Sequence, residues 1–276
     1  ILFIISGLGY LAWILHKGEF TSQYLEDFIN ERFKSEQFYT SIKEPKINFD
    51  KNEMRIILDS KDFSIFSYDN KKISEFENLK VHINFLPLIT ERKLDTNKVE
   101  MINGEINLPT VFSKPLIINS IILEGNLNPQ DDEIIIDKFS TSIEKDLYKG
   151  SAKLNLKKTI ANGTLTKLFK NKIFQELDLN SENMDFVVDK EGFEINGNSN
   201  LGGVDVSLKG KKNYKDKSKF ISKYEITGTI DENNIQDLFN SKVSEYIKGP
   251  IEINATYYIF KNNKEKIKTN SDLINA

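Results

Sequence analysis

Several segments of the chain alternate apolar and polar residues without interruption, and this pattern constrains the fold more than any other feature. The four clearest segments are Leu79–Phe85, Ala152–Leu156, Val204–Leu208 and Ile251–Tyr257. In a β-strand, successive side chains point to opposite faces of the sheet, so each segment has one apolar and one polar face. The polar positions hold residues such as Lys, Asp, Asn, Ser and Glu, which indicates a face in contact with water. The pattern predicts a mainly β protein with a long, mostly antiparallel sheet.

A short motif made of an apolar residue, one spacer and glycine recurs along the chain. It occurs, for example, as Ile102-Asn-Gly104, Ile195-Asn-Gly197 and Leu208-Lys-Gly210, and it holds eight of the 14 glycines. Glycine inside a strand marks a bulge, a bend or the close approach of another backbone. A sheet interrupted in this way should twist, so we expect it to be curled.

The apolar face of such a sheet has to be covered. A second sheet would make a sandwich, whereas a curled sheet leaves a groove that can hold lipid acyl chains at about 0.8 kcal/mol per buried methylene. Periodicity alone leaves both possibilities open. If the sheet forms a groove, its inward residues bind lipid, and the candidates are Val81, Ile83, Phe85, Leu154, Leu156, Val204, Val206, Ile251 and Ile253.

The first 15 residues carry no charge, and Tyr10 and Trp13 stand near the end of this stretch. A full membrane span needs about 20 apolar residues, and aromatic residues favour the membrane interface. We therefore expect a transmembrane anchor over residues 1–16 that is truncated at its start. A buried core helix and the apolar part of a signal peptide are the alternatives, although no A-x-A-like cleavage site follows.

Apolar residues at three- and four-residue steps predict several amphipathic helices. The first is a juxtamembrane helix within residues 17–40, which either packs against the end of the sheet or lies on the membrane surface. Two further short helices are predicted over Leu165–Leu177 and Ile235–Ile247, where they would cover an end or an edge of the sheet. The rest of the chain, residues 41–276, is expected to be the β-groove domain, incomplete at its C-terminus.

The motif content does not favour an enzyme. The chain has no cysteine and two histidines, and His82 falls on the polar side of its alternating segment. Phosphate-binding glycine loops, zinc-protease motifs and nucleophile motifs are missing from the sequence. The 38 basic and 41 acidic residues are interspersed, unlike the basic patch of a nucleic-acid-binding protein. We expect no catalytic residue, no metal ligand, no cofactor and no nucleic-acid partner.

Parts of the chain resemble AsmA-like proteins. Ile56–Ile73, which follows the expected anchor and amphipathic helix, looks like the start of that family. In the next segment, Leu86, Leu88 and Ile89 match the family's leucine-leucine corner, and Gly104 matches the glycine of the strand that follows. Asp231–Tyr257 is similar to large members of the YhdP and TamB type. The resemblance extends over most of the chain.

The resemblance implies a bridge-like lipid transfer protein of a Gram-negative bacterium, of which this chain is an N-terminal portion. Such a protein is held in the inner membrane by a single span, and the bulk of the chain lies in the periplasm. Its β-groove carries phospholipid toward the outer membrane, so its partners are phospholipid, the inner membrane and other envelope proteins. The alternative is an envelope assembly factor that offers its sheet to other proteins and transports no lipid.

Overall fold

The computed structural model describes residues 20–21, 23–32, 38–50, 52–91, 93, 95–109, 114–130, 132–174, 177–214, 220–231, 249–262 and 264–272. The expected anchor over residues 1–16 and the expected helix over Ile235–Ile247 lie outside these residues. The chain divides into two compact units, residues 1–144 (unit 1) and residues 145–276 (unit 2).

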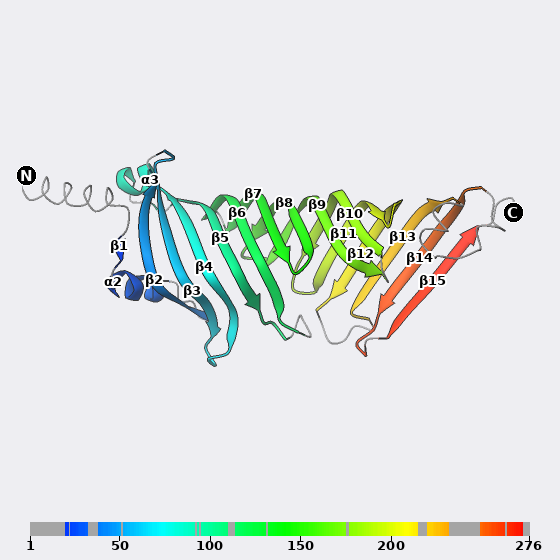
Figure 1. The fold of residues 1–276 in the computed structure, drawn as a ribbon, viewed down its shortest axis with the longest axis horizontal. Coiled ribbons are helices and arrows are strands. Elements are labelled where there is room, and N and C mark those ends of the chain that lie inside the picture. The colour runs from blue at the N-terminus through cyan, green and yellow to red at the C-terminus, as the bar shows by residue number, and fades with distance from the viewer. Residues whose placement is uncertain are drawn as a thin grey trace, which may run out of the picture. The chain divides into compact units, whose positions relative to one another are not determined.

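Unit 1 is an antiparallel sheet with two short helices in its described part (Figure 1). Strands that are neighbours in the sheet are also neighbours in the chain. The elements are β1 (Phe20–Thr21), α2 (Gln23–Arg32), β2 (Phe38–Asp50), β3 (Arg55–Ser67), β4 (Lys72–Asn84), α3 (Phe85–Thr90), β5 (Thr96–Ile106), β6 (Leu116–Gln130) and β7 (Glu133–Ile143).

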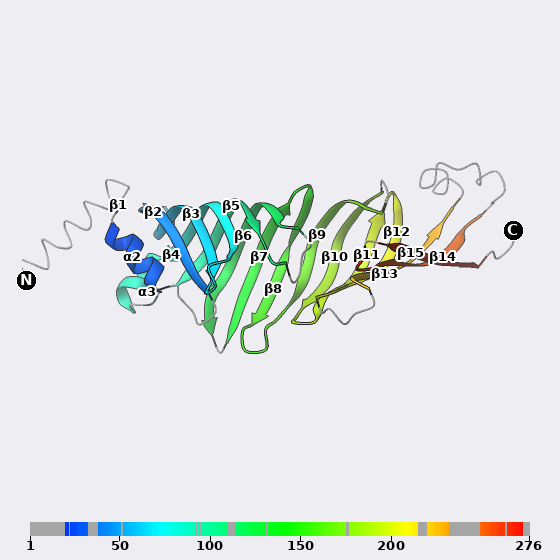
Figure 2. The same cartoon turned by 90° about the horizontal axis from the view of Figure 1, so that it is seen from below.

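Unit 2 is also an antiparallel sheet whose strands pair in chain order (Figures 1 and 2). Its strands are β8 (Asp146–Asn155), β9 (Ile160–Phe174), β10 (Leu177–Val188), β11 (Gly192–Leu201), β12 (Val204–Asn213), β13 (Ser222–Ile230), β14 (Ile251–Ile259) and β15 (Glu265–Asp272).

The prediction of a mainly β, antiparallel fold is confirmed, whereas the described residues contain fewer helices than predicted. Among the described residues of either unit, the first strand does not pair with the last, so neither sheet closes. Of the described residues within 17–40, Gln23–Arg32 form α2, and strand β2 begins at Phe38. Neither helix in the described part of the chain has the length and apolar character that a membrane span requires.

The predicted helix over Leu165–Leu177 is wrong, because the described residues of this segment lie in β9 and at the start of β10. Leu165 pairs with Gly150, but the next pair is Lys167 with Lys149, so Thr166 is an extra residue in β9. A bulge of this kind lets residues three apart share one face of the sheet. Leu165 and Leu168 accordingly are both buried, at 4% and 3% exposure. A bulged strand therefore produces the spacing that looked helical.

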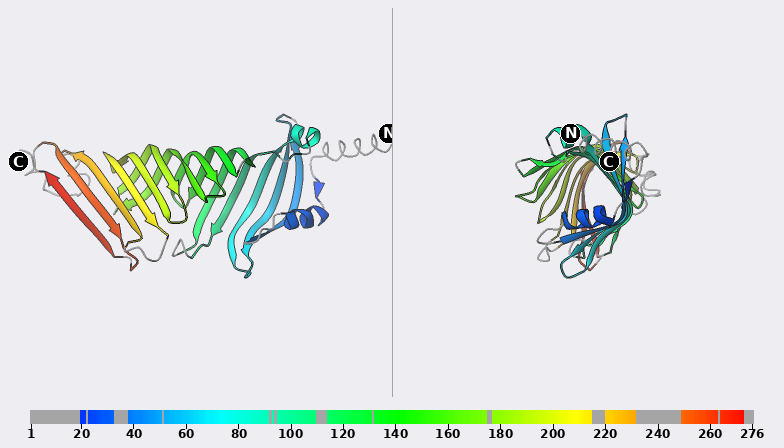
Figure 3. Two further views of the ribbon diagram at one scale, coloured as in Figure 1. Left: turned by 180° about the vertical axis from the view of Figure 1, so that it is seen from behind. Right: turned by 90° about the vertical axis from the view of Figure 1, so that its left-hand side faces the viewer.

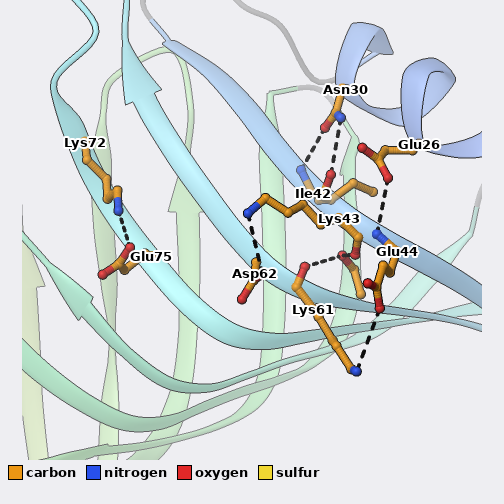
Figure 4. Close-up of polar contacts among 10 residues, drawn as sticks. Glu26, Asn30, Ile42, Lys43, Glu44, Lys61, Asp62, Lys72 and Glu75 are labelled. Atoms are coloured by element: carbon orange, nitrogen blue, oxygen red, sulfur yellow. Dashed lines mark hydrogen bonds and ion pairs between the residues drawn. The ribbon is translucent and has the colours of Figure 1, made fainter. Parts of the chain in front are cut away.

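Two bulges also lie beside each other in β2 and β3. Glu44 and Asp62 have positive φ angles of 47° and 52°, and the register of the β2–β3 pair shifts near them. The lysine that precedes each bulge residue reaches the bulge residue of the other strand, with 3.7 Å from Lys43 to Asp62 and 3.8 Å from Lys61 to Glu44 (Figure 4). Bulges increase local twist and bending, which is consistent with the bent strands of unit 1 in Figure 3.

Helix α2 lies against the edge of β2, next to the short strand β1 (Figures 3 and 4). The side-chain oxygen of Asn30 accepts the backbone N–H of Ile42 at 2.8 Å, and its amide nitrogen donates to the Ile42 carbonyl at 3.4 Å. The Glu26 carboxylate accepts the backbone N–H of Glu44 at 3.2 Å. The unpaired backbone groups of an open sheet edge can pair with other chains. The side chains of Asn30 and Glu26 bind such backbone groups at the edge of β2.

At several glycines of the motif, a neighbouring strand comes too close for a side chain. A Cβ atom at Gly163 would lie 2.0 Å from the carbonyl oxygen of Ser151 and 2.9 Å from the ring of Phe186. At Gly104 it would lie 2.4 Å from the ring of Phe76. A strand glycine can mark a bulge, a bend or the close approach of another backbone. At Gly163 and Gly104 it marks close approach, and a phenylalanine ring of the neighbouring strand lies over the glycine.

Candidate functional site

One face of the unit 1 sheet is apolar across six strands. A row of directly paired residues crosses β2 to β7 and consists of Ile47, Leu58, Val81, Val99, Leu123 and Phe139. Directly opposed residues share a face, so this row is a continuous apolar stripe. Ile42, Leu58 and Leu79 form its buried centre, and neighbours such as Val81 and Met101 pack against them while they stay half-buried.

The opposite face of unit 1 is charged. Asp59, Lys80 and Glu100 form one row of directly paired residues. Lys80 lies 3.7 Å from Asp59, and Glu100 Oε1 lies 3.0 Å from both His82 Nε2 and Lys98 Nζ. Burial would raise the pKa of Glu100, but the hydrogen bonds from Lys98 and His82 outweigh it, so the pKa is lowered. His82 lies on the polar face, as the alternation predicts, and is a partner of Glu100.

One face of the unit 2 sheet is likewise apolar. A row of paired residues crosses β9 to β14 and consists of Leu165, Met184, Gly197, Leu208, Ile226 and Ala255. Met184 is 0% and Leu208 is 1% exposed. The outward neighbours on β12, Asp205, Ser207 and Lys209, are all exposed, so the two faces differ as sharply as in unit 1.

Two of the three residues of unit 1 that were predicted to bind lipid are strand residues on the apolar face. Val81 is in the row described above, and Ile83 pairs with Ile56 in the next row. Phe85 is not a strand residue as predicted, because β4 ends at Asn84 and Phe85 begins α3. Its ring nevertheless packs edge-on against Phe49, with 5.1 Å between ring centroids.

Four of the six predicted residues in unit 2 come together. Val204, Val206 and Ile251 belong to one buried cluster, and Ile253 packs against it. Leu154 lies apart from this cluster on β8, where it pairs with Ala161. Leu156 is not in a strand, because β8 ends at Asn155, and Leu156 is 43% exposed at the turn that follows.

Sequence reasoning missed the most deeply buried part of the unit 2 face. Leu179 and Met184 are 1% and 0% exposed, and neither stands in one of the segments with uninterrupted alternation. The pairing of β10 with β11 shifts between Asn180 and Asn183, which interrupts the period of two there. The alternation after Val204, in contrast, does continue to Leu208, and could have identified that residue.

Polar side chains also lie on the apolar face of unit 2, near the start of β8 and the end of β9. Lys170 pairs directly with the buried Leu179, so the two share this face. Its Nζ lies 2.7 Å from Asp146 Oδ2, the atom that also accepts the Tyr148 hydroxyl at 3.2 Å. The other carboxylate oxygen of Asp146 accepts the backbone N–H of Asn171 at 2.9 Å.

The surroundings of these groups shift their protonation. Burial raises the pKa of Tyr148 to about 12. Burial acts to lower the pKa of Lys170, but Tyr148 and Asp146 outweigh it, so the pKa is raised. At neutral pH, Tyr148 is therefore a neutral hydroxyl and Lys170 is a cation.

A second lysine faces the same side from β12. Lys212 pairs directly with Phe193 and with Ser222, which is 5% exposed. Burial, followed by the positive charge of Lys170, lowers the pKa of Lys212. The period of two that begins at Val204 extends to Lys212. The sequence therefore predicts that Lys212 lies on the same face of the sheet as Val204. Lys170 had no such signal, because it falls in the segment with helical spacing.

No protein-family model, no curated protein and no solved structure matches this chain. The resemblance to AsmA-like proteins therefore stays a proposal.

Proposed function

We propose that the apolar faces of the two units bind the acyl chains of phospholipids, and that the protein moves phospholipid toward the outer membrane of a Gram-negative bacterium. The observation that carries the proposal is a single sheet layer in each unit that is apolar on one face and polar on the other. Within the described residues of each unit, no second sheet packs on the apolar face. Such a face requires a cover in water, and acyl chains supply one at about 0.8 kcal/mol per buried methylene.

The burial of single side chains favours a sheet that curls toward its apolar face. Met184 and Leu208 are almost fully buried although the sheet is one layer thick, and bending toward this face brings its side chains together. A sheet that curls in this way leaves a groove on its apolar face.

The proposed location rests on the sequence. The uncharged stretch up to Leu15 fits a single inner-membrane span, and the resemblance to AsmA-like proteins supports a periplasmic location for the bulk of the chain. An anchor in the inner membrane would keep the apolar faces beside a source of phospholipid. The proposed partners are phospholipid, the inner membrane and other envelope proteins.

Site-specific photo-crosslinking tests the groove. A photoreactive amino acid is placed at the half-buried Val81 and Ile253, and at Lys80 and Asn254, which are the adjacent residues on the opposite face. Lipid adducts are expected from Val81 and Ile253 and not from the two controls. Equal labelling of both faces would show that the apolar faces do not bind lipid selectively.

Native mass spectrometry separates this function from the assembly-factor alternative. After mild extraction, the protein is expected to carry bound phospholipid, because its acyl chains cover the apolar faces. Detection of the protein without bound lipid but in complex with other envelope proteins would support the assembly factor instead.

A further inference from the structure

Two exposed apolar side chains lie at the end of unit 1 where β2 and β4 finish. Leu86 in α3 is 59% exposed, and Met54 in the turn between β2 and β3 is 44% exposed. The backbone N–H of Phe85 donates to the Met54 carbonyl at 3.1 Å, which joins the turn to the helix. The turn itself is held by Asp50, whose side chain accepts the backbone N–H of Asn52 at 2.9 Å. We call the surface that carries Leu86 and Met54 the α3 end.

The α3 end is continuous with the apolar face of unit 1. The last row of directly paired residues on this face consists of Phe49, Ile56 and Ile83. The Phe49 ring packs against the ring of Phe85 in α3, with 5.1 Å between the ring centroids. A partner that covers Leu86 would therefore lie beside the end of the apolar face.

Exposure alone does not identify this partner, because exposed apolar residues also occur at the other end of the same strands. Tyr68, in the turn between β3 and β4, is 57% exposed, and single exposed hydrophobic residues are common on protein surfaces. Figure 1 shows this turn and α3 at opposite ends of the strands. Another observation has to distinguish the two ends.

The direction of β1 provides that observation. β1 is antiparallel to β2, with Phe20 opposite Ile47, so from its second residue to its first it points toward the end of β2 at Asp50. This is the α3 end, and Ile47 is three residues from Asp50, about 10 Å along a strand. The uncharged stretch that we expect to enter the membrane ends at Leu15, five residues before Phe20, and five residues span at most about 18 Å. The expected anchor is therefore within reach of the α3 end.

The charges near the α3 end favour a contact through apolar burial over attraction to charged headgroups. Residues 50–55 contain two acidic and two basic residues, and so do residues 91–95 after α3. Each segment therefore has a net charge of zero. Apolar side chains on surface helices enter the boundary between lipid headgroups and acyl chains, about 5–10 Å deep.

We propose that the α3 end, through Leu86 and Met54, inserts into the surface of the lipid bilayer that the expected anchor enters. This inference rests on the membrane anchoring in the proposed function, but not on the binding of acyl chains to the apolar faces. The contact brings the end of the unit 1 apolar face, at Phe49 and Ile83, beside the bilayer, where lipid can pass between them.

Fluorescence quenching on the full chain tests the contact. The chain has no cysteine, so a single introduced cysteine carries a polarity-sensitive fluorophore alone. The test positions are Leu86→Cys and Met54→Cys. The controls are Tyr68→Cys, at the other end of the strands, and Ile253→Cys, on the apolar face of unit 2.

The full chain is reconstituted in vesicles of membrane-spanning tetraether phospholipid, with nitroxide quenchers on the hydrocarbon chains. Such a lipid has a headgroup at both ends, so the protein cannot extract it without drawing a polar group through the hydrocarbon. Quenching then reports contact with the bilayer and not with a lipid carried on the sheet.

We expect the nitroxides to quench the labels at Leu86 and Met54 and to leave those at Tyr68 and Ile253 unquenched. Leu86→Asp should remove the quenching of the label at Met54 without loss of β-sheet circular dichroism, whereas Leu86→Met should preserve it. Raising the salt concentration should not reduce the quenching, because the contact is apolar.

Several outcomes would overturn the proposal. Equal quenching at Leu86 and Tyr68, or at Leu86 and Ile253, would show that the α3 end has no contact of its own with the bilayer. Loss of quenching in high salt would show that charge, and not apolar burial, causes the contact.

Flotation of the vesicles separates this proposal from the proposed anchoring. A chain that floats with the vesicles while its Leu86 label is unquenched would show that the anchor inserts and the α3 end does not. A chain that does not float would contradict both.

Discussion

The Tyr148 hydroxyl is a polar group on the apolar face of unit 2, and its surroundings raise its pKa. Burial raises its pKa to about 12, and the hydroxyl donates a hydrogen bond to Asp146. A carboxylate acceptor and partial burial both favour the neutral phenol over the phenolate. At the residue scale, this group therefore links folding to alkaline pH.

The sign of that link follows from the two states of the chain. Tyr148 in the unfolded chain loses its proton near pH 10, whereas the folded chain keeps it until about pH 12. Its contribution to stability is therefore fully present below pH 10 and is lost as the pH rises through this window. The absorbance of phenolate at 295 nm, as a difference between the unmodified chain and Tyr148→Phe, should show a titration near pH 12. A titration near pH 10 would contradict the prediction.

Gly163 shows how a single missing side chain permits two strands to approach. A Cβ atom there would meet the carbonyl oxygen of Ser151 at 2.0 Å and the ring of Phe186 at 2.9 Å. Gly163→Ala is expected to reduce the free energy of unfolding by about 2 kcal/mol or more, because the strands have to move apart. Urea denaturation measures this. Asn162→Ala, at an exposed neighbour, is the control and should change stability by less than about 0.5 kcal/mol.

At the scale of elements, α2 protects the edge of β2 through side chains such as Asn30. Asn30 bonds both backbone groups of Ile42, as a neighbouring strand would. Asn30→Ala is expected to destabilise unit 1 by about 1–3 kcal/mol, since it leaves these edge groups without that partner. The Ile42 amide should also exchange its hydrogen faster. Gln23→Ala, which alters an exposed residue of the same helix, is the control. Unchanged exchange at Ile42 in Asn30→Ala would show that α2 does not protect the edge.

The elements also show what sequence patterns can predict and where they fail. Regular alternation predicts strands correctly because a period of two indicates a β-strand with two different faces, as at Val204–Leu208 in β12. The segment from Leu165 was misread because the extra residue at Thr166 turns a period of two into a spacing of three. Bulges depend on the partner strand, which a single strand's sequence does not specify. Lys170 was missed for the same reason.

Strand ends were equally hard to place. Leu156 continues the alternation of its segment, yet β8 ends one residue earlier. The Asn155 side chain accepts the backbone N–H of Lys158 at 2.8 Å, a turn contact that ends the strand. The sequence thus predicts which face a residue would occupy, but the hydrogen bonds of turns decide whether the strand reaches that residue.

At the scale of the whole molecule, the sequence predicted the mainly β class but not the division into two units. The division is not visible in the sequence because both units use the same pattern of apolar and polar faces. The predicted lipid-binding residues fall in both, with Val81 and Ile83 in unit 1 and the cluster around Val206 in unit 2. If both units bind lipid, a defect in one should reduce the lipid carried by the molecule without abolishing it.

A charge on one apolar face tests this expectation. Ile253 packs against the Val204, Val206 and Ile251 cluster, and Asn254 is its exposed neighbour on the other face. Ile253→Asp places a carboxylate where acyl chains would lie, and Asn254→Asp adds the same charge on the polar side. Because burying an unpaired carboxylate in hydrocarbon is strongly unfavourable, acyl chains should avoid the altered region.

We expect Ile253→Asp to retain its β-sheet circular dichroism and to lose a substantial part of its co-purified phospholipid, measured by native mass spectrometry. Asn254→Asp should carry as much phospholipid as the unmodified chain. Unfolding of Ile253→Asp would instead indicate a sealed core, since a groove open to water can hydrate a carboxylate whereas a closed core cannot. Equal lipid content in both variants, with both folded, would show that the unit 2 face does not hold the lipid.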